Sequence, residues 1–177
     1  WSGFSWENDG WGVDTQSVKC LSVQAGSSIV SDNFKPLSVL GAGQSLTVEW
    51  KLKIANVSDY NTPIMSFMST DTYDPNTTNG VIVFPTKVLV LTSSNRNEVQ
   101  QSVNFEEGEQ LHFALVFQSG YGTTGRNLCR IYINGIQQSV FEYDGSSSFG
   151  NGSLKLGQTS TDLYLYMFRT YNGVSLE

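Results

Sequence analysis

His112 is the only histidine in the chain and the residue best suited by its type to acid–base chemistry. It lies in an alternating run between Leu111 and Phe113, so in a strand it projects to the face opposite those apolar neighbours. Arg130 and Gln118 can share its face, and a base beside a cation and an amide is what a polysaccharide lyase needs. The competing interpretation is a surface or half-buried histidine on a sheet.

Glu49 is the one glutamate in a cleanly alternating strand pattern. Retaining glycoside hydrolases need a second carboxylate facing the first across the sugar, and no such alternating pair is present. Thr47, Lys51 and Lys53 share the face of Glu49, so we expect a solvated face with cross-strand pairs. The chain also lacks a nucleophile elbow, a Cys–His pair and a phosphate-binding loop.

Two long irregular segments, 69–79 and 119–127, are candidate binding loops because loops of this length in compact domains often bind ligands. Exposed aromatic rings with neighbouring amides and charges are typical of sugar sites. The candidates are Tyr73, Asp74 and Asn76 in the first loop and Tyr121 and Arg126 in the second. A site on the sheet face, with Glu49, His112 and Arg130, is the alternative, since alternation does not say which face is open.

Oxygen-rich clusters make calcium a possible cofactor, and no other cofactor is indicated. Asp71 and Asp74 lie among further oxygen-bearing residues in the first loop, and Asp9 and Asp14 lie near the start of the chain. Calcium takes six to eight oxygen ligands. The same residues equally suit turns that bind no ion.

Alternating apolar and polar residues predict an all-β chain, and the clearest run is 46–54. Asn134-Gly135 between two such runs predicts a two-residue type I′ hairpin. About 11 to 13 short strands favour an antiparallel β-sandwich with jelly-roll topology. The further expected strands are 18–23, 28–34, 64–68, 80–84, 88–92, 98–105, 110–118, 129–134, 139–143, 153–156 and 163–171. The expected core positions are Trp50, Leu52, Ile54, Phe67, Leu111, Phe113, Leu115, Phe117, Ile131, Ile133, Leu165 and Phe168.

The composition limits the classes of partner. The formal charge is -6 and the basic residues are scattered, which argues against nucleic acid as a partner. No apolar run is long enough for membrane insertion. The 177 residues suit one domain, 1–177. Because the chain starts at Trp1 and ends at Leu176-Glu177, we expect a module excised from a larger polypeptide.

The two cysteines, Cys20 and Cys129, both fall in strand-like runs. One disulfide is the largest number that they can form. Two buried free thiols are the favoured interpretation, because free cysteine packs well in cores.

Several segments in order resemble concanavalin A-like, laminin-G-like jelly-roll modules of bacterial and phage surface proteins. They are the opening 4–11, the strand 45–50, the pair 113–117 and 130–135, and the closing 168–172. The resemblance implies a jelly-roll fold that hosts lectins, lyases, hydrolases and adhesion domains. Many relatives carry an acid just inside the last strand, where this chain has Tyr164, with Asp162 two residues earlier.

The expected function is therefore a non-catalytic, lectin-like module that binds a glycan or polysaccharide. Its expected location is extracellular, on a cell surface or on a virion. A structural or adhesion domain without a sugar site is the alternative. A lyase centred on His112 and Arg130 is a third hypothesis.

Overall fold

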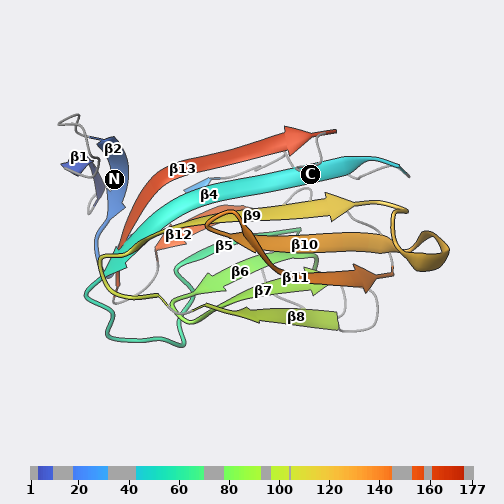
Figure 1. Cartoon of the computed structure of the whole chain (residues 1–177). Helices are drawn as coiled ribbons and strands as arrows, with labels where there is room; N and C mark the ends of the chain where they lie inside the picture. Colours follow the sequence, from blue (N-terminus) through green and yellow to red (C-terminus); the bar gives the residue numbers. More distant parts are fainter. Residues whose placement is uncertain are drawn as a thin grey trace.

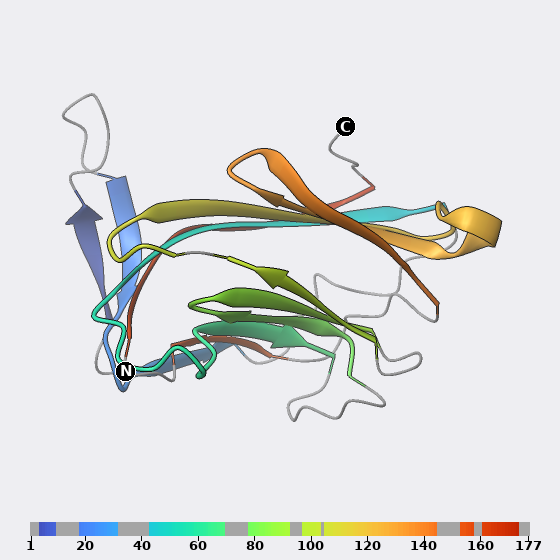
Figure 2. The ribbon, with the colours of Figure 1, turned by 60° about the horizontal axis from the view of Figure 1, so that its bottom comes forward.

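The computed structural model of the chain describes residues 4–9, 18–31, 43–69, 78–92, 97–103, 105–144, 153–157 and 161–173. Two antiparallel sheets stack face to face in these residues (Figures 1 and 2). This is the β-sandwich that the alternation predicted. The only helix described is the three-residue 3-10 turn Thr123–Gly125, so no described helix is long enough to span a membrane.

The larger sheet has seven strands, in the order β1-β2-β13-β4-β9-β10-β11. Their bounds are Phe4–Asp9, Val18–Val23, Asp162–Asn172, Ser45–Ala55, Gln110–Gln118, Asn127–Ile133 and Ile136–Tyr143. The smaller sheet has six strands, in the order β3-β12-β5-β6-β7-β8. Their bounds are Ser28–Ser31, Leu154–Gly157, Met65–Met68, Gly80–Phe84, Lys87–Thr92 and Asn97–Ser102.

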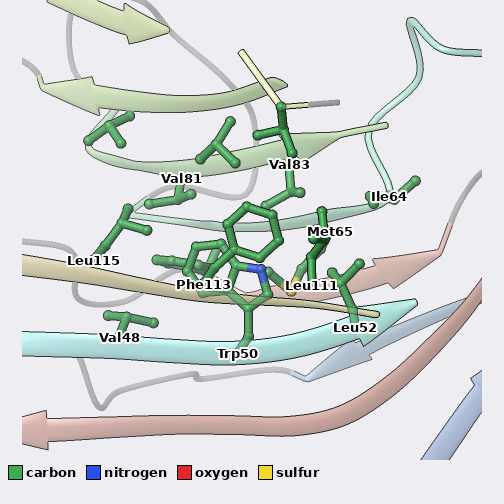
Figure 3. Packing of buried hydrophobic residues seen from close by; sticks show 14 of the residues in the cluster. Val48, Trp50, Leu52, Ile64, Met65, Val81, Val83, Leu111, Phe113 and Leu115 are labelled. Carbon is green, nitrogen blue, oxygen red and sulfur yellow. The ribbon is translucent and has the colours of Figure 1, made fainter. Parts of the chain in front are cut away.

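The core lies between the two sheets and is built from the inward residues of their strands. Trp50 on β4 stacks on Phe113 of the neighbouring β9, with ring centroids 5.2 Å apart. Phe67 on β5 of the opposite sheet meets the Trp50 ring edge-on at 6.0 Å. Figure 3 shows Trp50 and Phe113 pointing across the gap toward Val81 and Val83 of β6. The aromatic rings therefore join the two layers, as sandwich packing requires.

Most of the strand and core predictions are confirmed. The structure has 13 strands in the described residues, and ten of the twelve predicted core residues are buried. Ile133 and Phe168 are only partly buried but pack against the core. The positive φ angles of Asn134 and Gly135, 51° and 78°, match the predicted type I′ hairpin. The strand Phe4–Asp9 was not among the expected strands.

A β-bulge interrupts the pairing of β13 with β4. Leu165 pairs with Leu52 and Met167 pairs with Lys51, so Tyr166 is an extra residue on β13. An extra residue reverses which side chains of the following segment face the core. Phe168 therefore packs inward and Arg169 faces outward.

Both cysteines are buried and free in the structure, which agrees with the favoured sequence interpretation. Cys20 lies on β2 and Cys129 on β10, and three strands of the same sheet separate β2 from β10. Burial raises the pKa of the Cys129 thiol well above its ordinary value. Cys129 is thus a packing residue with little thiolate character.

We predict that Phe113→Ala lowers the free energy of unfolding by about 3–5 kcal/mol, because it leaves a cavity beside Trp50. Denaturant unfolding followed by tryptophan fluorescence measures the change. The control is Val140→Ala on β11, whose side chain is 51% exposed, with an expected cost below about 0.5 kcal/mol. Equal losses in the two variants would contradict this assignment of the core.

Candidate functional site

The outer face of the seven-stranded sheet points away from the six-stranded sheet (Figure 2). By register, polar residues of four neighbouring strands project from this face. These strands are β13, β4, β9 and β10. Register places Glu49 opposite Arg169 on one side and opposite Ala114 on the other. It likewise places Lys51 opposite His112. Residues directly opposite in antiparallel strands project to the same face.

Glu49 holds two side chains from different strands. Its Oε1 atom lies 2.6 Å from Nε2 of His112 on β9. Its Oε2 atom accepts a hydrogen bond from the Tyr171 hydroxyl on β13 at 3.2 Å. The Glu49 side chain is 15% exposed and that of His112 is 32% exposed. We call Glu49, His112, Tyr171 and Arg169 the outer-face cluster.

Arg169 completes this cluster. A hydrogen bond with Tyr171 raises the pKa of the Arg169 guanidinium, and the negative charge of Glu49 adds to the shift. The Tyr171 hydroxyl therefore lies between an anion and a cation. Such an arrangement orients the hydroxyl without the help of a ligand.

Short side chains lie between the long ones of this face. Thr47 and Val116 are fully buried and Ala114 is 5% exposed. Arg130 is directly opposite Val116, and its guanidinium donates a hydrogen bond to the side-chain oxygen of Gln118. The sequence predicted a solvated face around Glu49. The cross-strand pairs are confirmed, but Thr47 is wrong as a solvated residue, because it lies between Tyr171 of β13 and Val116 of β9 and is fully buried.

The charges on this face are mostly positive. Among the described residues, the outward cations of the four strands are Lys51, Lys53, Arg130 and Arg169, and the central anion is Glu49. These cations are four of the ten Lys and Arg residues of a chain with a net charge of -6. Asp162 lies at the far end of β13, where its carboxylate accepts hydrogen bonds from the Ala25 amide and the Asn56 side chain.

The loop between β9 and β10 forms a second polar region. Arg126 pairs with Asp144 at 2.9 Å and with Glu142 at 3.6 Å. Hydrogen bonds from the Thr123 backbone and hydroxyl hold the pKa of Glu142 below its ordinary value. A recess of about 390 Å³ lies here and is lined by Thr124, Gly125, Arg126, Asn127, Tyr143 and Asp144.

The predicted site residues divide into three groups. Glu49, His112 and Arg130 share the outer face, as one hypothesis required. Arg126 binds carboxylates of its own chain, while Tyr121 is 57% exposed with its hydroxyl 3.4 Å from the Gly43 carbonyl oxygen. The remaining candidates, Asp14, Asp71, Tyr73, Asp74 and Asn76, lie outside the described residues, and the Asp9 side chain does too.

Calcium remains a prediction. The described part of the chain contains no group of three or more His, Cys, Asp or Glu side chains that could hold a metal ion. Asp162 lies two residues before Tyr164, the position where many relatives carry an acid. Both of its carboxylate oxygens accept hydrogen bonds from the protein, which suits a structural role.

Arg169 and Tyr171 were missed as site residues. Uninterrupted alternation from Leu163 and Leu165 would place Arg169 and Tyr171 on the core side of the strand. The bulge at Tyr166 shifts the alternation by one residue, so that both side chains face outward. The available signal was Phe168, which was predicted as a core residue three positions after Leu165. That odd spacing already implies a change of phase within the strand.

The sequence matches no protein-family model and no curated relative. The structure is similar to several solved structures. A carbohydrate esterase from a Shiga toxin-encoding bacteriophage is 14% identical, with a TM-score of 0.57 over 97% of this chain and 87% of that chain. An endo-β-1,4-glucuronan lyase from the fungus Trichoderma reesei is 8% identical, with a TM-score of 0.58 over 97% and 87%.

The binding domain of botulinum neurotoxin serotype G is 11% identical, with a TM-score of 0.63 over 99% of this chain and 45% of that chain. At such identities the likeness shows the fold alone. The fold is the all-β jelly-roll sandwich that the sequence resemblance predicted.

We predict that neutral His112 carries its proton on Nε2, because an ionised carboxylate can only accept a hydrogen bond. Nitrogen NMR of labelled protein near pH 8 measures the tautomer. Glu49→Ala removes the acceptor and is expected to give a mixture of tautomers, whereas Glu142→Ala leaves the signal unchanged. A dominant Nδ1–H form in the unsubstituted protein would contradict the contact.

Proposed function

We propose that the outer face of the seven-stranded sheet binds an acidic polysaccharide that contains uronate sugars. The clustering of Lys51, Lys53, Arg130 and Arg169 around Glu49 in an otherwise acidic chain carries this proposal. Cations gathered on one face attract an anionic polymer, and the acidic remainder of the surface repels it. The charge pattern therefore favours an acidic glycan over a neutral one.

The groups on the face suit the two chemistries of such a polymer. Guanidinium groups match carboxylates in geometry and can bind them through two hydrogen bonds. His112, Tyr171 and Glu49 offer donors and acceptors for sugar hydroxyls. Each sugar hydroxyl exchanges a water bond for a protein bond with little net gain, so the affinity for one sugar unit is weak. Several sugars in a row are needed for useful affinity.

With this ligand, we propose that the domain works in an extracellular setting, on a cell surface or on a virion, as part of a larger polypeptide. Of the two sites that the sequence left open, the sheet face is our choice. The described part of the 119–127 loop carries its main cation, Arg126, already paired with Glu142 and Asp144. These two carboxylates offset the charge of Arg126, which weakens its attraction for a ligand carboxylate.

We predict that the domain binds oligogalacturonate, and that Arg169→Gln and Arg130→Gln each weaken binding about five- to tenfold, because each removes a cation. Calorimetry at low and high salt measures the affinities, and added salt is expected to weaken binding. The neutral control ligand is a chito-oligosaccharide of the same length.

Arg126→Gln is the matched control variant, because it removes a guanidinium from the loop outside the outer-face cluster. It is expected to leave the affinity within about twofold. If Tyr121→Ala or Arg126→Gln weakens binding more than Arg169→Gln, the site lies in the loop. If no acidic glycan binds to the folded protein, the structural or adhesion interpretation replaces this proposal.

A lyase is the second candidate function, and the pairing of His112 with Glu49 favours it. In β-elimination a base removes the proton beside the uronate carboxylate. The carbon–oxygen bond to the next sugar then breaks, a carbon–carbon double bond forms and an acid protonates the leaving oxygen. With its Nε2 proton directed at Glu49, His112 keeps the Nδ1 lone pair as a base. The Tyr171 hydroxyl can serve as the acid, and Arg169 can neutralise the carboxylate.

We predict that, if the domain is a lyase, incubation with polyuronates gives an unsaturated product that absorbs in the ultraviolet. His112→Ala would then lower the rate by at least about a hundredfold, the usual scale of general base catalysis. Denaturant unfolding of His112→Ala serves as the control for folding. If the protein binds polyuronates but gives no unsaturated product with any of a panel of them, the domain is a non-catalytic binding module.

A further inference from the structure

We propose that Glu49 is a specificity-determining residue that makes the outer face select polyuronates over densely charged, sulfated polysaccharides. This inference rests on the proposed binding of acidic polysaccharides. Four cations on one sheet face would by themselves attract any polyanion. A carboxylate in their midst makes the centre of the face unfavourable for a second anion.

The position of the Glu49 carboxylate carries the argument. Register places Glu49 directly opposite Arg169, and Lys51 follows two residues later on the same face of β4. Arg130 lies on β10, so that β9 alone separates it from β4. Any glycan that spans Arg169 and Arg130 therefore has to pass over the outward residues of β4 and β9. An anionic group of the glycan directly over β4 would meet the carboxylate.

The contacts of Glu49 keep its carboxylate in place. His112 and Tyr171 hold one oxygen each, at 2.6 Å and 3.2 Å, from strands on either side of β4. At 15% exposure, the side chain has little room to swing away from an approaching ligand. Each carboxylate oxygen still has a lone pair that can accept a hydrogen bond from a sugar hydroxyl. The centre of the face thus accepts hydroxyls and repels anions.

This arrangement distinguishes polymers by their density of charge. A polyuronate carries one carboxylate on each sugar and can turn hydroxyls toward Glu49. A heavily sulfated chain carries several anionic groups on each disaccharide and has few hydroxyls left to present. Repulsion between like charges at close range is costly where solvent is partly excluded. The sulfated chain therefore loses more affinity to Glu49 than the polyuronate does.

The test compares oligogalacturonate with a heparin oligosaccharide of equal length on the intact chain. The unsubstituted protein is expected to bind oligogalacturonate more tightly. Glu49→Gln is expected to raise the ratio of heparin affinity to oligogalacturonate affinity about tenfold, because it removes the charge that repels the sulfated chain. Glu142→Gln is the matched control, because it changes the net charge equally on edge strand β11 and is expected to leave the ratio of affinities unchanged.

Glu49→Asp separates charge from hydrogen bonding. It keeps the carboxylate while shortening the reach to His112 and Tyr171, so the preference for oligogalacturonate is expected to persist. Tighter binding of heparin by the unsubstituted protein would overturn the inference without any variant. An equal shift of the ratio of heparin to oligogalacturonate affinity in Glu49→Gln and Glu142→Gln would also overturn the inference. In that case, binding of oligogalacturonate would still support the proposed function. Binding of neither polymer would overturn both.

Discussion

The strict alternation of β4, between its two partners in the middle of the seven-stranded sheet, is the constraint on which the rest of the structure depends. Its inward residues, Trp50 among them, supply the centre of the core, and its outward residues supply the centre of the outer face. A slip of one residue would exchange the two sets and place charges in the core. The stack of Trp50 on Phe113 opposes that slip, because both rings are fully buried. The same register of β4 therefore determines both the core and the candidate site.

The outer face shows how a sheet can organise polar groups without a deep cavity. Hydrogen bonds from His112 and Tyr171 fix Glu49 between β9 and β13. The side chains of Glu49 and His112 are only 15% and 32% exposed, and partial exclusion of water makes interactions among charges stronger than on an open surface. The cluster is thereby preorganised, which reduces the entropy lost when a ligand binds.

The distinction between a binding module and a lyase depends on small differences in this arrangement. Both functions use cations for the sugar carboxylate and hydrogen-bonding groups for hydroxyls. Catalysis further requires a proton acceptor within reach of the reacting carbon, and His112 is the one histidine able to supply it. The jelly-roll sandwich does not decide the matter, since similar folds occur in an esterase, a lyase and a toxin binding domain.

Local patterns in the sequence were enough to determine the all-β class, most strand positions, the Asn134-Gly135 hairpin and the outward direction of His112. These features depend on side-chain alternation and turn chemistry, which act over a few residues. Only the tertiary structure decided that Tyr171 and Arg169 join Glu49 and His112. Strand order brings β13 beside β4, and the bulge at Tyr166 turns its last residues outward. Pairing between strands more than a hundred residues apart follows from the packing of the whole sandwich, and no local pattern encodes it.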